Sequence, residues 1–154
     1  MRRITIKKGA LLQKSGELDS KVYHVNSGLL RSYTLDEKGK EHIFMFAPEN
    51  WTIGDSLPPD VPCELYIDAL EDSDVWVLQK DIQREAPNIA AFIKRLSVLQ
   101  KRVIMLMSAS ATERFEHFEQ TYPDILQRVP QKMIASYLGI APETLSKLKR
   151  ERHK

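Results

Sequence analysis

The sequence predicts an α+β fold: an antiparallel β-barrel comes first, one long helix follows, and a pair of short helices ends the chain. Three observations lead to this prediction. Short apolar or alternating runs separated by turn residues recur from Ile4 to Gln79. Apolar residues then follow a helical period from Ile89 to Leu106. Finally, Gly139 separates two short amphipathic segments. We therefore expect three regions: the barrel at 1–86, the long helix at 87–110 and the terminal helices at 111–154.

The predicted strands are short and closely spaced. The runs are ITI, ALLQ, KVYHV, LLRSYTL, HIFMFA, LYIDAL and VWVL, with no helical segment between them. Such spacing is typical of an all-β barrel or sandwich. The stretch DEKG between two runs predicts a hairpin in which Gly39 adopts a positive φ.

The long helix carries a heptad pattern. Its apolar residues are separated alternately by three and four positions, as in the contact seam of a coiled coil. A flank of further apolar residues gives the helix a second face, which we expect to pack on the barrel. The seam would then meet the same helix of a second chain, which predicts a homodimer. The alternative is that the whole helix is the core of a monomer. The seam residues are Ile89, Phe92, Leu96, Leu99, Val103 and Leu106, and the flank is Ile93, Ile104 and Met107.

Two shorter helical segments adjoin the long helix. Residues 81–87 are expected to form a short helical turn. Ser110 and Glu113 have the spacing of a capping box, which predicts a new helix start at the end of the seam. Phe115 and Phe118 would lie on the inner face of this helix, and Pro123 would end it.

The C-terminal segment has the spacing of a helix-turn-helix. Pro130 and Pro142 suit the first turns of two helices, where a missing N–H is tolerated. Ala135 allows the helices to approach closely, Gly139 supplies the turn, and Leu145 locks the second helix onto the first. In such a unit the second helix enters the major groove of DNA.

The excess of positive charge near the C-terminus indicates an anionic partner for this end of the chain. From residue 128 onward there are seven Lys or Arg against two Glu, whereas the other 127 residues carry 16 basic and 19 acidic side chains. Glu143 can accept a hydrogen bond from cytosine N4, and Lys147 can donate to guanine O6 and N7. The alternative interpretations are that Glu143 only interacts favourably with the helix dipole and that the lysines only keep the protein soluble. Further candidate DNA contacts are Ser146, Lys149, Arg150, Arg152 and Lys132.

These elements together resemble the Crp/Fnr superfamily of bacterial transcription regulators. The stretches GALLQKSGE, YHVNSG and DEKGKE follow the family in order, and RVPQKMIASYLGIAPETLSKLKR resembles its DNA-binding unit. The resemblance implies a cyclic-nucleotide-binding-like jelly roll, a dimerisation helix and a C-terminal helix-turn-helix. The family's base-contacting glutamate and basic residue map onto Glu143 and Lys147. Its frequent arginine before that glutamate is Pro142 here, a style that looks like the regulators common in Bacteroidetes.

The resemblance also implies a degenerate effector pocket. Family members that bind cyclic AMP use a Gly-Glu and a following Arg-Ser or Arg-Thr pair; here Gly54-Asp55 and Cys63-Glu64 take those places. No Lys or Arg lies between Lys40 and Lys80, whereas a buried cyclic phosphate needs a donor fork or a cation. We therefore expect that cyclic AMP does not bind in the usual way. The sequence leaves open whether the barrel binds another, unknown small-molecule effector.

The sequence also bears on the other sensing chemistries of the family. One cysteine, Cys63, cannot hold an iron–sulfur cluster or a disulfide within one chain. His24 and His42, the candidate haem ligands, lie in predicted strands and are expected to be ordinary barrel residues. We expect no metal and no cofactor. The chain stops after the second short helix, so we expect neither the family's β wing nor its leading helix.

We therefore expect a dimeric, sequence-specific DNA-binding transcription regulator rather than an enzyme, with double-stranded DNA and RNA polymerase as partners. No apolar run could cross a bilayer and no signal-peptide pattern is present, so the expected location is cytoplasmic, without a membrane partner. Two alternatives lack DNA binding. One is a cyclic-nucleotide-responsive barrel protein. The other is a cupin-like metal-binding barrel, although neither His24 nor His42 belongs to a His-x-His motif.

Overall fold

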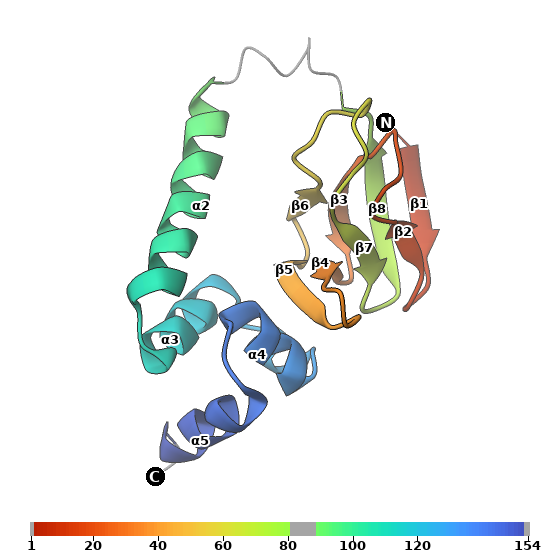
Figure 1. Ribbon diagram of the computed structural model, residues 1–154. Coiled ribbons are helices and arrows are strands. Elements are labelled where there is room, and N and C mark those ends of the chain that lie inside the picture. The colour runs from red at the N-terminus through yellow and green to blue at the C-terminus, as the bar shows by residue number, and fades with distance from the viewer. Residues whose placement is uncertain (1, 81–88, 153–154) are drawn as a thin grey trace. The chain divides into compact units, whose positions relative to one another are not determined.

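The computed structural model describes residues 2–80 and 89–152, and the chain divides into two compact units, 1–82 and 83–154. All of the described strands belong to the first unit and all of the described helices to the second (Figure 1). The helical turn expected at 81–87 lies outside the described residues. Within the described ranges, no helix is both long and apolar enough to cross a membrane.

The N-terminal unit contains two four-stranded antiparallel sheets. The first has the order β1 (Arg2–Ile6), β8 (Ser73–Leu78), β3 (Val22–Ser27), β6 (Thr52–Gly54). The second has the order β2 (Leu11–Gln13), β7 (Tyr66–Ala69), β4 (Leu30–Leu35), β5 (Glu41–Ala47). The seven predicted runs correspond to seven of these strands. β6 was not predicted; it is held by pairing with β3.

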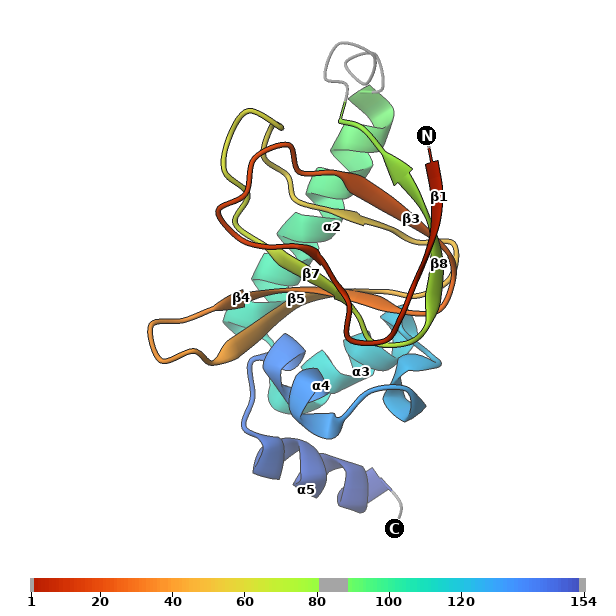
Figure 2. The same ribbon diagram turned by 90° about the vertical axis from the view of Figure 1, so that its right-hand side faces the viewer.

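The hairpin of β4 and β5 confirms the predicted turn (Figure 2). Gly39 has a φ of 75°. The carboxylate of Asp36 accepts hydrogen bonds from the backbone N–H groups of Lys38 and Lys40, at 2.9 and 3.0 Å. A hydrogen bond with His42, together with these backbone donors, holds the pKa of Asp36 below its usual range.

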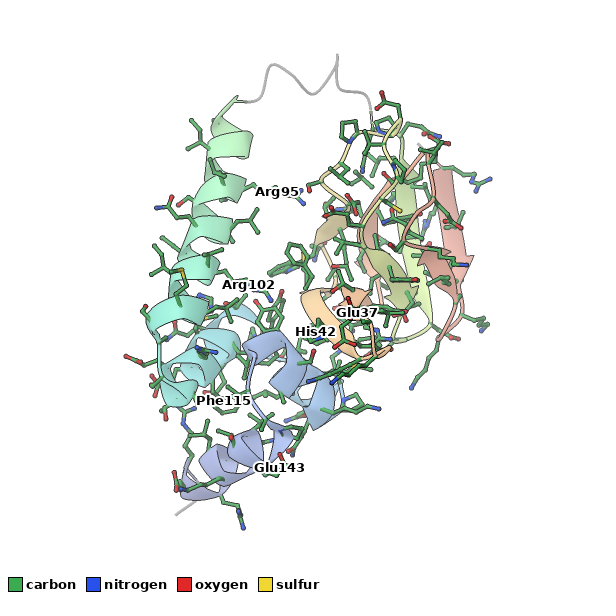
Figure 3. The ribbon with its side chains drawn as sticks, viewed as in Figure 1. Glu37, His42, Arg95, Arg102, Phe115 and Glu143 are labelled. Atoms are coloured by element: carbon green, nitrogen blue, oxygen red, sulfur yellow. The ribbon has the colours of Figure 1, made fainter. Side chains whose placement is uncertain are left out.

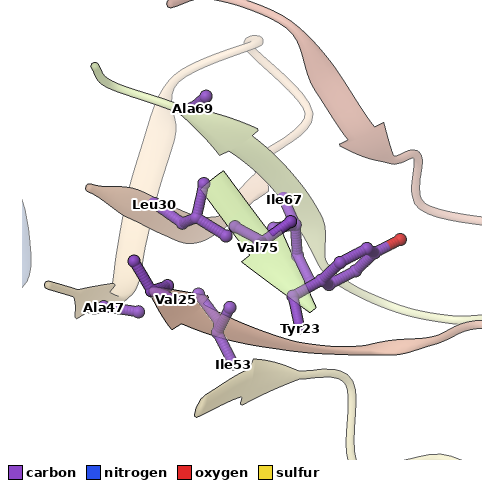
Figure 4. Close-up of a cluster of buried hydrophobic side chains, with 8 residues drawn as sticks. All are labelled: Tyr23, Val25, Leu30, Ala47, Ile53, Ile67, Ala69 and Val75. Atoms are coloured by element: carbon purple, nitrogen blue, oxygen red, sulfur yellow. The ribbon is translucent and has the colours of Figure 1, made fainter. Parts of the chain in front are cut away.

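Both sheets contribute to one apolar core (Figure 4). Alternate residues of β3 and β7 are buried, as expected for strands with one face turned inward. This alternation explains why the sequence pattern located these strands. The buried cluster consists of Tyr23, Val25, Leu30, Ala47, Ile53, Ile67, Ala69 and Val75.

The C-terminal unit is helical. Its elements are α2 (Ile89–Ser108), α3 (Ala111–Thr121), the 3-10 turn η1 (Ile125–Gln127), α4 (Gln131–Leu138) and α5 (Pro142–Arg152). The capping box is confirmed: Glu113 N–H donates to Ser110 Oγ at 3.3 Å, and Ser110 N–H donates to Glu113 Oε2 at 2.7 Å.

Aromatic side chains hold α3 and α4 together. Phe118, Tyr122 and Tyr137 are buried, and their ring centroids lie 5.3–5.6 Å apart in tilted or edge-to-face arrangements. Phe115 and Phe118 are both buried, as the sequence predicted for the inner face of α3. This aromatic cluster thereby packs α4 against α3.

Candidate nucleic-acid interface and effector pocket

The connection between α4 and α5 depends on a left-handed residue. Gly139 has φ 64° and ψ 35°, a conformation that glycine adopts at little cost. Its N–H donates to the carbonyls of Ala135 and Ser136, and the N–H of Ile140 donates to the carbonyl of Ala135. The chain therefore leaves α4 in a capped turn and enters α5 three residues later.

One side of α5 anchors the helix and the other is exposed. Leu145 is fully buried, in keeping with its predicted role, and Leu148 is half-buried. On the opposite side Glu143 and Lys147 lie one turn apart and are both exposed. Figure 3 labels Glu143 on the first turn of α5. The geometry leaves a carboxylate and an ammonium group facing outward from an anchored helix.

The other residues predicted to contact DNA have varied surroundings. Ser146 and Arg150 are exposed on α5, Lys132 is exposed at the start of α4, and Lys149 is half-buried. The Ser146 hydroxyl donates to the carbonyl of Pro142 at 3.1 Å. Ser146 and Arg150 thus add exposed polar side chains to the helix that carries Glu143 and Lys147.

Arg152 is engaged within the unit. Its guanidinium pairs with Glu119 and with Glu116 of α3, the latter at 2.8 Å, and lies 5.3 Å from the ring centroid of Phe115. The hydrogen bond to Glu119 raises the pKa of Arg152 above its ordinary value. This residue, a predicted DNA contact, therefore ties the last turn of α5 to α3.

The seam lies along α2 with its apolar side chains largely uncovered. Leu96, Leu99 and Val103 are 54%, 37% and 54% exposed, and Leu106 is half-buried. The side chains of Ile89 and Phe92 lie outside the described ones. The flank residues Ile93, Ile104 and Met107 are exposed as well.

The predicted effector residues come together around one carboxylate. Asp55 is buried directly after Gly54, and its carboxylate accepts the backbone N–H groups of Leu57, Glu64 and Leu65 at 2.8–2.9 Å. Cys63 is buried, with its Sγ 3.1 Å from the carbonyl oxygen of Lys14. Glu64 is exposed. The loop 55–65 is thus organised by an anion belonging to the protein.

Two cationic side chains from outside residues 41–79, the stretch without Lys or Arg, form hydrogen bonds with residues of that stretch. Lys80 Nζ donates to the Leu57 carbonyl at 2.7 Å. The Arg31 guanidinium donates to both carboxylate oxygens of Asp68, at 2.8 and 2.9 Å, and to Glu41. Burial alone would lower the pKa of Arg31, but the hydrogen bonds to Asp68 and Glu41 outweigh it and raise the pKa. Both cations already have partners in this unit.

The two strand histidines also have protein partners. His24 Nδ1 lies 3.0 Å from Thr52 Oγ1, and His42 Nε2 lies 3.0 Å from Asp36 Oδ2. Among residues 2–80 and 89–152, no group of three or more His, Cys, Asp or Glu side chains is placed to hold a metal ion.

Sequence reasoning missed several contacts that shape the site. The roles of Asp55 and Arg152 depend on donors or acceptors up to 36 residues away in the chain. No local spacing marks such residues. For Asp55 the general chemical rule applies: a carboxylate that is buried needs hydrogen-bond donors, which the backbone of residues 57–65 supplies.

No family model matches the chain. Curated proteins do: the chain is 28% identical over 167 aligned residues to the fumarate and nitrate reduction regulatory protein of Yersinia pestis, covering 96% of this chain and 67% of the relative. It is 25% identical to the anaerobic regulatory protein of Haemophilus influenzae, covering 96% and 65%. The chain thus spans about two thirds of the length of these relatives.

Solved structures show the same fold. FixK2 from Bradyrhizobium japonicum superposes with a TM-score of 0.79 at 21% identity, covering 99% of this chain and 84% of that one. The regulator CLP of Xanthomonas campestris, described as responsive to c-di-GMP, gives 0.72 at 13% identity, covering 99% and 86%. A Crp/Fnr-family regulator from Thermus thermophilus gives 0.71 at 15%, covering 97% and 84%. This chain is therefore similar in sequence to the fumarate and nitrate reduction regulatory protein, and similar in fold to regulators of the Crp/Fnr family.

Proposed function

We propose that this chain is a sequence-specific DNA-binding transcription regulator that acts as a homodimer. The observation that carries the proposal is the exposed Glu143–Lys147 face of α5, a helix anchored by Leu145 and joined to α4 through Gly139. In this proposal 111–154 is a helix-turn-helix domain, 87–110 a dimerisation helix, and 1–86 a cyclic-nucleotide-binding-like barrel.

The recognition chemistry follows from the two side chains. With α5 in the major groove, the Glu143 carboxylate accepts from cytosine N4 and the Lys147 ammonium donates to guanine O6 or N7. Lys147 Nζ lies 3.9 Å from Glu151 Oε1, and both side chains are exposed, so solvent screening makes this pair weak. Exchanging it for a base contact therefore costs little. Lys132, at the start of α4, then contacts a phosphate, and Ser146, Lys149 and Arg150 contact phosphates or base edges.

The exposed seam supports the second part of the proposal. A row of uncovered apolar side chains on one helix gains from burial against an identical row, and a two-fold axis along α2 presents two copies of α5. Such a dimer binds half-sites about one helical turn, roughly 34 Å, apart. The resemblance further implies contact with RNA polymerase in the cytoplasm.

The barrel serves as a sensory or structural unit that does not bind cyclic AMP in the usual way. Support comes from Asp55, whose carboxylate takes the N–H groups of Glu64 and Leu65 that an anionic ligand would otherwise use. Calorimetric titration of the purified chain with cyclic AMP is expected to give no heat of binding.

The experiment that tests the proposal is selection of DNA from a random pool by the purified chain. We expect enrichment of a near-palindromic sequence, with an affinity that falls steeply as salt rises because phosphate contacts release counterions. Enrichment of no palindrome, or binding insensitive to salt, would refute the proposal.

Two substitutions then separate base contacts from phosphate contacts. Lys147→Ala should relax preference at one base position, at about 1–3 kcal/mol for a good contact. The matched control, Lys132→Ala, also removes an exposed lysine but should weaken all sequences equally and leave the preference unchanged. Equal effects of the two variants on preference would show that the wrong helix face was assigned.

A further inference from the structure

The last four carbonyls of α4 have no partner within the helix, as in any α-helix. Those of Ala135 and Ser136 accept from the turn that follows, through Gly139 and Ile140. The carbonyls of Tyr137 and Leu138 instead accept from arginine side chains of α2 and α3. The C-terminal end of α4 is therefore held by two other helices.

Arg114 joins three backbone segments. From the first turn of α3, its Nη2 donates to the carbonyl of Leu106 in α2 at 2.6 Å, and its Nε donates to the carbonyl of Ala109 at 3.1 Å. Its Nη1 donates to the carbonyl of Leu138 in α4 at 3.1 Å. A single planar guanidinium thus fixes the end of α2, the link to α3 and the end of α4 in one arrangement.

Arg102 adds a second connection from α2. Its guanidinium carbon lies 3.9 Å from the ring centroid of Tyr137, and its Nη2 lies 3.5 Å from the Tyr137 carbonyl oxygen. Figure 3 shows Arg102 reaching from α2 toward α4. Both arginines place positive charge at the carbonyl end of α4, where the helix dipole favours it.

The turn itself touches the same junction. A Cβ added to Gly139 would lie 3.5 Å from Arg114 Nη1 and 3.8 Å from Leu106 Cδ2. Leu106 is also the last residue of the seam. The seam of α2 therefore ends next to the turn that sets the direction of α5.

We propose that Arg102 and Arg114 are positioning residues that fix the α4–α5 pair on the end of α2 and thereby set the half-site spacing the dimer accepts. The inference rests on the function proposed above. Apolar contacts between the helices are non-directional and tolerate small rotations, whereas the arginine hydrogen bonds have defined directions and lose strength when the helices turn. Because each α5 is attached to its own α2, a loose junction in both chains would widen the range of distances between the two recognition helices.

The test compares the affinity for the selected palindrome with that for the same half-sites moved apart or together by one or two base pairs. We expect the wild-type chain to favour one spacing by about tenfold or more, a difference of about 1.4 kcal/mol. Arg114→Gln and Arg102→Gln should reduce that preference to about threefold or less. The base preference within each half-site should stay unchanged, a pattern that simple loss of folded protein does not give.

A matched control is available next to Arg102. Lys101 is exposed on α2, so Lys101→Gln removes the same charge and should leave the spacing preference intact. Arg114→Lys should fall between wild type and Arg114→Gln because an ammonium cannot reproduce the three-way fork. If Arg114→Gln does not fold, the spacing preference of Arg102→Gln alone tests the inference, because the hydrogen bond from Arg102 to the Tyr137 carbonyl is longer than those that Arg114 donates and its loss should disturb folding less.

The outcomes distinguish this inference from the function on which it rests. If Arg102→Gln and Arg114→Gln keep both the spacing preference and the base preference of wild type, the inference is overturned. The proposed function would then still stand. Uniform loss of affinity and of base preference would also overturn it, because the arginines would then be needed only for folding. A wild-type chain that favours no palindrome would refute the proposed function and this inference with it.

Discussion

The carboxylate of Asp55 accepts the backbone N–H of Glu64 at 2.8 Å. This contact joins two residues nine positions apart around a buried carboxylate, and the N–H groups of Leu57 and Leu65 converge on the same group. The residues that would form an effector pocket are therefore held together by the carboxylate of Asp55.

Asp55→Ala should destabilise the N-terminal unit because it leaves three partly buried backbone N–H donors without the acceptor that they share. The expected loss is roughly 2–4 kcal/mol, since each unsatisfied buried donor costs about 1–3 kcal/mol and water re-enters part of the loop. Both tryptophans, Trp51 and Trp76, lie in this unit, so urea unfolding followed by tryptophan fluorescence measures the change. Asp60→Ala, at an exposed position in the same loop, is the control and should be nearly neutral. Equal stability of the two variants would contradict the account.

Two glycines should respond differently to alanine. At Gly139 the added Cβ has room, so Gly139→Ala should cost only the strain of a left-handed residue, about 1–2 kcal/mol. At Gly28, with φ 92°, the Cβ would lie 2.6 Å from the Asp72 carbonyl oxygen and would also overlap Ser73. Gly28→Ala should therefore cost roughly 2–5 kcal/mol, because overpacking adds to the strain. Urea unfolding measures the stability of both variants. It is followed by tryptophan fluorescence for Gly28→Ala and by helical circular dichroism for Gly139→Ala. A larger loss of stability in Gly139→Ala than in Gly28→Ala would contradict this prediction.

Alkaline pH should destabilise the N-terminal unit through Tyr23. Burial, followed by the nearby Glu17 and Cys63, raises the pKa of Tyr23 to about 12, whereas an unfolded chain ionises its tyrosines near about 10. Stability should stay level below pH of about 10 and fall between about 10 and 12, where only the unfolded state has lost the proton.

Tyr23→Phe isolates this effect. The variant lacks the hydrogen bond from the Tyr23 hydroxyl to the Leu12 carbonyl, so it should be less stable than wild type by about 1 kcal/mol at neutral pH. The difference should shrink above pH of about 10, because the variant has no phenol to ionise. Urea midpoints across the alkaline range measure it, and a constant difference would show that Tyr23 does not titrate late.

Most of the secondary structure could be predicted because it depends on local patterns. Short apolar or alternating runs located seven strands, the capping box located the start of α3, and Gly139 located the turn between α4 and α5. β6 was missed because its three residues include a single apolar side chain, that of Ile53, and the strand depends on pairing with β3. Short strands of this kind carry no periodicity of their own.

The candidate site was predictable only in part for a related reason. Spacing identified the exposed face of α5, since helix geometry places Glu143 and Lys147 together whatever surrounds them. It did not reveal that Arg152 pairs with α3 or that Arg31 reaches Asp68, because those partners lie 33 to 37 residues away. Tertiary ion pairs of this kind follow from the fold and leave no mark on the local sequence.

The central claim is that two chains pair along the α2 seam to bind DNA. The most direct measurement is sedimentation equilibrium of the full chain, alone and with its selected palindrome, for wild type and Leu99→Glu. Wild type should sediment at about twice the chain mass of 17.8 kDa, because burial of the exposed seam outweighs the cost of association. Leu99→Glu should sediment as a monomer and lose the palindrome, whereas Lys101→Glu, exposed on α2 but outside the seam, should stay dimeric. A wild-type chain that is monomeric both alone and on DNA, or a Leu99→Glu variant that still dimerises, would contradict the account.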